Sequence, residues 1–371
     1  MQSDKKLHLW NKIKIIMQPL IGLTQQEISD ELQKLGVEKY RAKQIWTWIY
    51  FHGVRNFDDM NNISKDLRKK LAENFSIARP KIDTHLISKD GTQKWLLEFR
   101  DGEKVEMVYI PAEDRGTLCI SSQIGCAMNC RFCNTGYHGF VRNMTPEEIV
   151  SEVLIARDEL GEWNNLNSKI GEGRLISNIV VMGMGEPLVN YDNIVKALKI
   201  INDPDGIAFS NRRITLSTCG LVPQIKKLGD DLKVNLAISL HASTDEIRKQ
   251  IMPIAEKYTI KEIMEACRDY AKKINDRRIT FEYIMIKDLN DSEDDALRLI
   301  NLVRKYKVPA KFNLIPFNPW KGCIFKEPSD QKTIDKFAKI LTDARFPAPV
   351  RKSRGQDIMA ACGQLKSKDI N

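Results

Sequence analysis

The sequence predicts an α/β protein, a partial (β/α)6 barrel that follows a small N-terminal helical domain and a β-ribbon linker. Three observations predict this architecture. The first eighty or so residues have helical periodicity, residues 84–111 alternate with a period of two, and from residue 117 onward six short apolar segments alternate with amphipathic ones. Six βα units favour a parallel sheet with helices outside, but a closed barrel has eight. We therefore expect a barrel that is open on one side.

Length and composition suit a folded protein of two or three domains. The chain has 371 residues, of which 42% are hydrophobic and 29% are charged. No apolar run reaches the roughly 20 residues of a membrane span, and residues 7–23 lack the apolar core and cleavage site of a signal peptide. We therefore expect a cytoplasmic protein that does not contact a membrane. The net charge of +9 favours an anionic partner, above all nucleic acid.

The N-terminal domain, residues 1–83, is expected to contain three helices. Apolar residues recur at helical spacing over residues 24–35, 38–51 and 63–75, and Gly36 ends the first helix. The third helix has basic residues on its exposed side, at Arg68, Lys69 and Lys70. Such a domain could bind RNA through its phosphates. The alternative is a packing module whose lysines and arginines are only solvated.

Residues 84–111 form the expected β-ribbon linker, residues 112–347 the barrel, and residues 348–371 a C-terminal segment. The ribbon has strands over residues 94–99 and 103–110, joined by a turn at Asp101-Gly102. The barrel strands are expected at residues 118–123, 176–182, 213–217, 234–240, 279–286 and 312–316. The expected helices include residues 145–160, 260–274 and 294–306. The first of these begins with Thr145-Pro146, and Glu148 completes a capping box.

Three of the eight cysteines, Cys126, Cys130 and Cys133, form a C-x3-C-x2-C motif. Eight cysteines without a secretory signal do not suggest a disulfide scaffold. Three thiolates on one short loop can bind three irons of a cubic iron–sulfur cluster, which leaves the fourth iron open to another ligand. The alternative is a structural zinc ion with His138 as the fourth ligand. A loop after the first barrel strand favours an active site, because active sites gather at the carboxyl ends of parallel strands.

This motif, with Phe132 before its last cysteine, resembles that of the radical S-adenosylmethionine superfamily. The resemblance implies one [4Fe-4S] cluster per chain, held by the three cysteines of the motif. It also implies that S-adenosyl-L-methionine binds the fourth iron, where one-electron cleavage of the sulfonium gives a 5′-deoxyadenosyl radical. The partial (β/α)6 barrel of the superfamily agrees with the predicted fold.

Further motifs resemble one family of this superfamily, the bacterial dual-specificity RNA methyltransferases. They lie at residues 105–111, 115–119, 125–136, 182–187, 239–242 and 354–363. The resemblance implies methylation of C2 of adenosine 2503 in 23S rRNA and of adenosine 37 in tRNA, with an electron donor such as flavodoxin. A sister family, the Cfr-like enzymes, methylates C8 of the same ribosomal adenosine and stays an alternative. The alternative from another class is a zinc-stabilised RNA-binding module without catalysis.

The resemblance also implies three catalytic residues. C2 of adenine is an electron-poor carbon without a lone pair, so ordinary methyl transfer from a sulfonium fails. Cys362 matches the methyl carrier of the family, which takes a methyl group from one S-adenosylmethionine while a second supplies the radical, two molecules per turnover. Cys119 matches the cysteine that resolves the RNA adduct and leaves a disulfide with Cys362. Glu106 matches the base that takes the C2 proton.

Seven residues match the cofactor-binding positions of the family. Gly185 and Glu186 match the stretch that holds the amino group of S-adenosylmethionine, since glycine allows close backbone approach and a carboxylate pairs with an ammonium. The other matching positions are Ser217, Ser239, Leu240, His241 and Asn318. The remaining cysteines, Cys219, Cys267 and Cys323, match no role and are expected to be structural.

Overall fold

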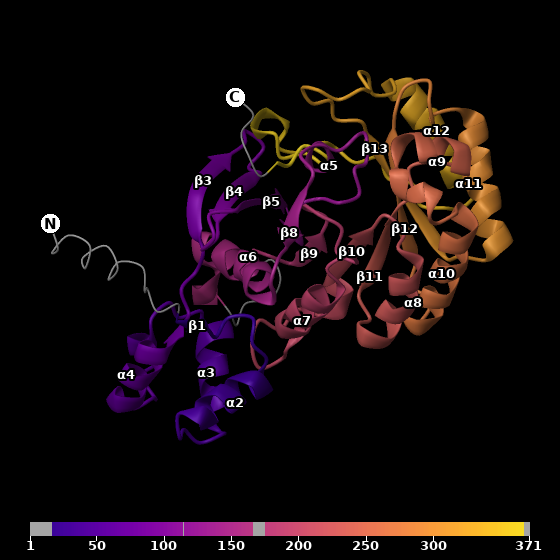
Figure 1. The fold of residues 1–371 in the computed structure, drawn as a ribbon. Helices are drawn as coiled ribbons and strands as arrows, with labels where there is room; N and C mark the ends of the chain where they lie inside the picture. Colours follow the sequence, from indigo (N-terminus) through magenta and orange to yellow (C-terminus); the bar gives the residue numbers. More distant parts are fainter. Residues whose placement is uncertain (1–16, 114, 166–174, 367–371) are drawn as a thin grey trace, which may run out of the picture.

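The structure of the chain is a computed structural model that describes residues 17–113, 115–165 and 175–366. The first 16 residues of the expected helical domain and the last five of the expected C-terminal segment lie outside the described residues. Figure 1 shows a small group of helices beside a larger α/β body. In the described ranges, no helix combines the length and the apolar character needed to cross a bilayer.

The N-terminal domain contains the three expected helices. They are α2 (Gln25–Lys34), α3 (Arg41–Tyr50) and α4 (Lys65–Asn74), with a short 3-10 helix η1 (Phe57–Asp59) and a parallel pair of strands, β1 (Gln18–Pro19) and β2 (Phe75–Ser76). A capping box starts α2, because the side chains of Thr24 and Glu27 each accept the backbone N–H of the other. The ion pair between Arg79 and Asp158, 3.1 Å apart, joins this domain to the barrel.

A nine-stranded sheet runs through the rest of the molecule in the order β13-β12-β11-β10-β9-β6-β5-β4-β3. Six neighbouring strands are parallel: β6 (Arg115–Ile120), β9 (Asn178–Val181), β10 (Ile214–Thr218), β11 (Asn235–Ser239), β12 (Ile279–Met285) and β13 (Ala310–Pro316). They confirm the six βα units that the sequence predicts, and Figure 1 shows the curved sheet with helices outside it.

Helices follow these strands. They are α6 (Pro146–Glu159), α7 (Tyr191–Asn202), α8 (Val222–Asp231), α9 (Asp245–Ile251), α10 (Ile260–Lys273), α11 (Glu293–Tyr306) and α12 (Gln331–Asp343). The three whose bounds were predicted, α6, α10 and α11, begin and end within one residue of the predicted positions. The predicted capping box of Thr145 and Glu148 starts α6, and Pro146 occupies its first turn. Between α6 and β9 lies a 3-10 helix η2 (Glu162–Asn165), and further 3-10 turns are η3 (Asn211–Arg213), η4 (Pro253–Glu256) and η5 (Gln356–Ile358).

The ribbon is not a separate linker, because its strands extend the barrel sheet. β5 (Lys104–Ala112) pairs with β6 in antiparallel fashion, and β4 (Gln93–Glu98) and β3 (Lys81–Ile87) follow outward. Strand β3 was not predicted from the sequence, and the expected domain boundary at residue 83 falls inside it. The physical reason is that β3 is mostly exposed on both faces, so its sequence lacks the alternation that marks a half-buried strand.

The prediction of one continuous first barrel strand over residues 118–123 is wrong. The structure divides it into β6 and a short strand β7 (Gln123–Gly125), which pairs with β8 (Phe140–Asn143) as a hairpin. At the break, the N–H of Ser121 donates to the carboxylate of Glu152 at 3.0 Å, and the N–H of Ser122 donates to the carbonyl of Met184 at 2.8 Å. These distant partners replace the ladder hydrogen bonds of a continuous strand. The loop that contains the three-cysteine motif therefore lies between β7 and β8.

Residues 347–366, here called the C-terminal strap, span the open side of the barrel. The strap first runs beside β13, where the N–H of Arg351 donates to the carbonyl of Leu314 at 2.8 Å. It then reaches the ribbon, where the Arg354 guanidinium donates to the carbonyl of Pro111 at 2.9 Å and Ser88 donates to Asp357. Because β13 and the ribbon lie at opposite ends of the sheet order, the strap joins the two ends. Figure 1 shows it in yellow, passing close to α5 (Asn134–Tyr137).

Candidate active site

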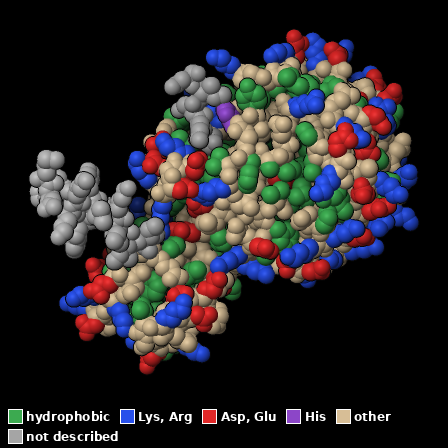
Figure 2. Space-filling model, in the orientation of Figure 1, with side chains coloured by type: hydrophobic (Ala, Val, Ile, Leu, Met, Phe, Trp, Pro, Cys, Tyr) green, Lys and Arg blue, Asp and Glu red, His purple; other side chains and the backbone are tan. Residues whose placement is uncertain are grey.

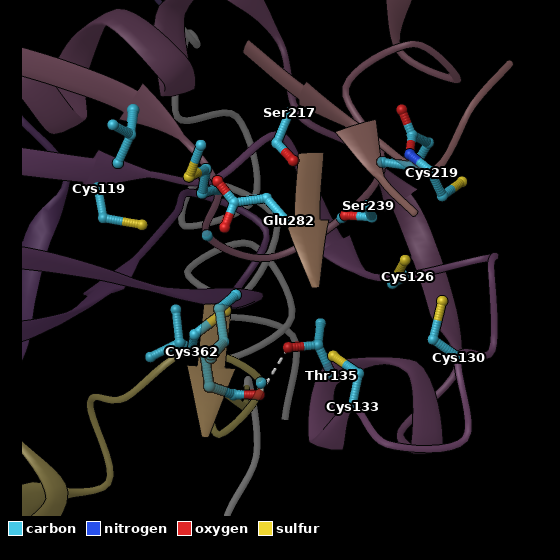
Figure 3. Close-up of a pocket in the computed structure, with 18 of the residues that line it drawn as sticks. Cys119, Cys126, Cys130, Cys133, Thr135, Ser217, Cys219, Ser239, Glu282 and Cys362 are labelled. Atoms are coloured by element: carbon cyan, nitrogen blue, oxygen red, sulfur yellow. Dashed lines mark hydrogen bonds between the residues drawn. The ribbon is translucent and has the colours of Figure 1, made fainter. Parts of the chain in front are cut away.

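A pocket lies at the carboxyl ends of the parallel strands, and Figure 3 shows the residues around it. Most of the predicted site residues line it: Cys119, Cys126, Cys130, Cys133, Gly185, Glu186, Ser217, Ser239, His241 and Cys362. Three others, Glu106, Leu240 and Asn318, are not among the lining residues and lie beside the pocket. Residues so distant in the sequence meet here because successive parallel strands present their carboxyl ends at one edge of the sheet.

The loop from Cys126 to Cys133 is held at both ends by backbone hydrogen bonds. The N–H of Cys126 donates to the carbonyl of Gly139 at 2.8 Å, and the N–H of Cys133 donates to the carbonyl of Cys130 at 3.0 Å. Burial raises the pKa of Cys126 to about 12, and it also raises the pKa of Cys130 and of Cys133. Three enclosed thiols of this kind ionise only when a cation compensates their negative charge. Iron ions that bind the thiolates provide this compensation. The donor set therefore fits an iron–sulfur cluster.

The arrangement of the three cysteines differs from a site for a single metal ion. In the described part of the chain, no three His, Cys, Asp or Glu side chains lie close enough together to bind one metal ion. A cubic cluster does not require such closeness, because each cysteine binds a different iron. His138, the fourth ligand in the zinc alternative, is not among the residues that line the pocket.

The loop after β9 presents Gly185 and Glu186 to the pocket. Gly185 has a φ of +96°, and a Cβ at this position would lie 2.5 Å from the side chain of Gln123, so only glycine fits. The Glu186 carboxylate accepts the N–H groups of Leu188 at 3.0 Å and Cys219 at 2.7 Å. Burial raises the pKa of Glu186, so a cationic ligand group beside it would stabilise its ionised form.

Ser217 and Ser239 line the pocket from the neighbouring strands β10 and β11. Behind them lies Arg248 of α9, which is fully buried. Its guanidinium donates to the carbonyls of Cys219 and of Leu240, the latter at 3.2 Å, and thereby fixes the loops after both strands. Arg248 was not predicted from the sequence, because one arginine on an amphipathic helix gives no signal of burial.

His241 and Leu240 follow β11 directly. The Nδ1 atom of His241 accepts the N–H of Ile284 at 3.1 Å, and the ring packs edge-on against Phe132 of the cysteine loop. Burial lowers the pKa of His241 to about 3, so its imidazole is neutral at physiological pH. Leu240 is fully buried. Asn318 donates from its side-chain amide to the carbonyl of Cys362 at 3.3 Å, so it holds the strap.

Cys119 of β6 and Cys362 of the strap lie on the side of the pocket opposite the three-cysteine loop, as Figure 3 shows. Cys362 lines the pocket with part of its surface exposed. Burial raises the pKa of Cys119 to about 12 and that of Cys362 to about 11, and the nearby Arg351 guanidinium opposes both shifts. The two thiols are therefore protonated at neutral pH.

Glu106 is buried beside the pocket, contrary to the usual exposure of a glutamate in an alternating strand. Its Oε1 lies 2.8 Å from the ammonium of Lys94, and its Oε2 accepts the N–H of Lys366 at 2.8 Å. Burial raises the pKa of Glu106, and Lys94 opposes that rise. The carboxylate that the sequence assigns as a base thus contacts the same strap as Cys362.

Two charged residues that the sequence analysis missed also line the pocket, Glu282 of β12 and Arg351 of the strap. Glu282 accepts a hydrogen bond from the side-chain amide of Asn313 at 2.7 Å, and its carboxylate lies 3.9 Å from Arg351. Figure 3 shows Glu282 on the same side as Cys119 and Cys362. A single glutamate in an apolar strand gives no sequence signal, and the position of Arg351 depends on the path of the strap.

The open barrel with three cysteines at the carboxyl ends of its strands defines a radical S-adenosylmethionine protein. Residues 120–300 match the model of the radical SAM superfamily, and residues 18–77 match the ribosomal RNA large subunit methyltransferase N-terminal domain. The chain belongs to the RlmN family of the radical SAM superfamily. It therefore uses a [4Fe-4S] cluster and S-adenosyl-L-methionine as cofactors.

Curated relatives and a solved structure support this assignment. The dual-specificity RNA methyltransferase RlmN of Rhizorhabdus wittichii is 52% identical over 94% of this chain and 86% of its own length. The protein of the same name from Rhodospirillum rubrum is 54% identical over 95% of this chain and 81% of its own length. A radical SAM methyltransferase from Sphaerobacter thermophilus is 40% identical, and its crystal structure superimposes with a TM-score of 0.87 over 95% of this chain and 100% of that one.

Proposed function

We propose that this chain methylates C2 of adenosine 2503 in 23S rRNA and of adenosine 37 in tRNA through an S-methylcysteine on Cys362. The observation that supports this proposal best is that Cys119, Cys362 and the three-cysteine loop line one pocket. The S-methyl group of the carrier must face the radical source and reach the adenine, and the resolving thiol must reach the sulfur of the carrier. The curated relatives named above, whose names specify a dual-specificity RNA methyltransferase, also support it.

We assign the cluster ligands to Cys126, Cys130 and Cys133. When bound, the cluster and S-adenosylmethionine supply a methyl group and the 5′-deoxyadenosyl radical that removes hydrogen from the S-methyl group. The residues assigned to hold S-adenosylmethionine are Gly185, Glu186, Ser217, Ser239, Leu240, His241 and Asn318. Among these, Glu186 provides a buried carboxylate that can pair with the ammonium of S-adenosylmethionine. The neutral His241 ring packs edge-on against Phe132 of the cysteine loop.

Three side chains perform the remaining steps. The Cys362 sulfur takes the methyl group, and its carbon later bonds to C2 of the adenine. The Glu106 carboxylate takes the C2 proton, while the electron pair of the C–H bond stays with the adenine ring. The radical adduct gives up one electron, which would return to the oxidised cluster. The Cys119 thiolate attacks the Cys362 sulfur and forms a disulfide. The electron pair of the broken C–S bond stays with the CH2 carbon, which takes a proton from solvent and becomes the new methyl group.

The N-terminal domain is proposed to bind RNA. The match of residues 18–77 to a ribosomal RNA methyltransferase N-terminal domain supports this role. On the face seen in Figure 2, however, basic and acidic side chains are interspersed over this domain. We therefore expect binding through a few phosphate contacts rather than through one continuous basic surface. An electron donor such as flavodoxin would supply the electron for the cluster, and the reaction would take place in the cytoplasm, where ribosomes and tRNA are found.

The test is an analysis of modified nucleosides by mass spectrometry. RNA from cells with and without the gene is digested, and 2-methyladenosine is quantified in fragments around adenosine 2503 and in purified tRNA. The proposal expects 2-methyladenosine at both positions only when the gene is present. The appearance of 8-methyladenosine would instead establish the Cfr-like alternative, and no gene-dependent methyladenosine would contradict both.

A further inference from the structure

Lys94 lies on β4 at the back of the pocket. In the register of β4 and β5, Leu96 lies opposite Glu106, so Lys94 is a diagonal neighbour of Glu106 on the same face of the sheet. Its ammonium lies 2.8 Å from Oε1 of Glu106 and donates to the carbonyl of Met359 at 3.2 Å. The side chains of Lys94 and Glu106 are only 7% and 6% exposed. The pair is therefore shielded from solvent and from salt.

This pair contacts the strap at residues before and after Cys362, the proposed methyl carrier. Met359 precedes Cys362 by three residues, and Lys366, whose N–H donates to Oε2 of Glu106 at 2.8 Å, follows it by four. One ammonium and one backbone N–H thus connect the carboxylate to the strap on both sides of Cys362. A lysine with only a stabilising role explains this poorly, because a buried ion pair stabilises a fold no better than apolar residues of the same volume.

We propose that Lys94 is a positioning residue for the base Glu106: its ammonium keeps the carboxylate ionised and ties it, through Met359, to the strap that presents Cys362. The inference rests on the proposed function, in which Glu106 takes the C2 proton. That step transfers the proton to a carboxylate oxygen and leaves the C–H electron pair on the adenine. Only the ionised form of Glu106 can accept the proton.

The electrostatics of the site agree with this role. Burial by itself raises the pKa of Glu106, and the cation of Lys94 acts against it. The other charged residue that contacts Glu106 in the described ranges is Lys366, on the strap. Without Lys94, the carboxyl would bind a proton at higher pH and could no longer act as a base there.

The test measures the pH dependence of a single turnover. Enzyme that already has a methyl group on Cys362 is mixed with an RNA fragment, S-adenosylmethionine and reductant, and the rate of 2-methyladenosine formation is followed across pH. In Lys94→Met, the acid limb of the profile should move upward by about one pH unit or more. In Lys94→Arg, which keeps the charge, the limb should stay near that of the unchanged enzyme. Methyl transfer to Cys362 itself needs no base at C2, so the pH at which that step loses activity should not differ among the variants, even where loss of the contact with Met359 changes its rate.

Lys81→Met is the matched control, because Lys81 lies on the adjacent strand β3 and pairs only at the surface with Glu98. Its profile should equal that of the unchanged enzyme. The inference would be overturned if the acid limb of the pH profile did not shift in Lys94→Met. It would also be overturned if the acid limb shifted as far in Lys94→Arg as in Lys94→Met. If the unchanged enzyme itself forms no 2-methyladenosine, it is the proposed function that fails.

Should Lys94→Met not fold, infrared difference spectra of the unchanged enzyme against Glu106→Gln decide the question. An ionised carboxylate band for Glu106 at neutral pH supports the role of Lys94. A protonated carboxyl band at that pH overturns it.

Discussion

The hydroxyl of Thr135 donates a hydrogen bond of 2.7 Å to the carbonyl oxygen of Leu365. Thr135 follows the last cysteine of the three-cysteine loop by two residues, and Leu365 follows Cys362 by three. The neighbouring Asn134 adds two contacts, from its N–H to the carbonyl of Gly363 at 2.8 Å and from its side-chain amide to the carbonyl of Gln364 at 3.0 Å. The loop proposed to hold the cluster therefore holds the strap that presents the proposed carrier.

Thr135→Val tests this connection. The variant keeps the size of the side chain and removes one hydrogen bond, a loss of about 0.5–1.5 kcal/mol that corresponds to roughly two- to tenfold in an equilibrium. We expect normal iron content but methyl transfer to Cys362 that is slower by such a factor, measured by mass spectrometry of the peptide. Thr342→Val, which removes a similar hydrogen bond within α12, should leave methyl transfer unchanged.

Replacement of Cys126, Cys130 or Cys133 by Ala should each time remove the iron and the brown colour and abolish cleavage of S-adenosylmethionine. Each thiolate is expected to bind a separate iron, and no other thiol takes its place. The sharpest control is Cys323→Ala, because Cys323 is buried against the same loop, with its Sγ 3.5 Å from the carbonyl of Arg131. That variant should keep its iron. Stoichiometric iron and sulfide in all three loop variants would contradict the ligand assignment.

Cys119→Ala should trap RNA on the enzyme. In the proposed scheme this variant accepts the methyl group and attacks the adenine, but it lacks the thiolate that cleaves the stable thioether to Cys362. A denaturing gel of the purified variant should show a slow, nuclease-sensitive band that disappears in the Cys119→Ala, Cys362→Ala double variant. Free and fully methylated RNA from the single variant would show that Cys119 is only a core residue.

Lys69→Ala with Lys70→Ala should weaken RNA binding. Both lysines are exposed on α4, although the Lys70 ammonium donates to the carbonyl of Leu35. Arg68 is half-buried and donates to the carbonyl of Asp58. Each phosphate contact that is lost should also reduce the slope of log affinity against log salt by about 0.7–0.9. Titration of labelled tRNA at several salt concentrations measures both effects. Lys332→Ala with Lys339→Ala on α12 is the matched control, and an equal loss of affinity there would argue against a specific role of α4.

The Cys362 thiol should react slowly with iodoacetamide at neutral pH in protein without cofactors. Its pKa is raised to about 11. Below that pH, the fraction of reactive thiolate, and with it the rate, should increase about tenfold for each unit by which the pH is raised. Loss of the Arg351 cation raises this pKa further, so Arg351→Met should react more slowly at the same pH. Peptide mass spectrometry reads out the alkylation. Arg345→Met, at an exposed position of the same region, should react like the unchanged protein.

The sequence predicted the barrel well because buried parallel strands are apolar runs between turn residues, and because Thr145 and Glu148 mark a helix start locally. It missed β3, whose two faces are both mostly exposed, and the break at Ser121, whose partners Glu152 and Met184 lie far along the chain. Tight spacing made the three-cysteine loop visible. The contacts of Lys94, Arg248 and Glu282 could not be predicted from the sequence, because each contact involves residues that only the fold brings close together.

The strap has a consequence for the order in which the protein matures. Synthesis proceeds from the N-terminus, so all nine strands of the sheet and the three-cysteine loop leave the ribosome before residues 347–366 do. Until then no strap spans the open side of the nascent barrel, and its mouth stays accessible to the machinery that delivers iron and sulfide. The contacts of Asn134 and Thr135 with the strap can form only after these last residues have been made. The order of synthesis therefore allows a cluster to be inserted before Cys362 reaches the pocket.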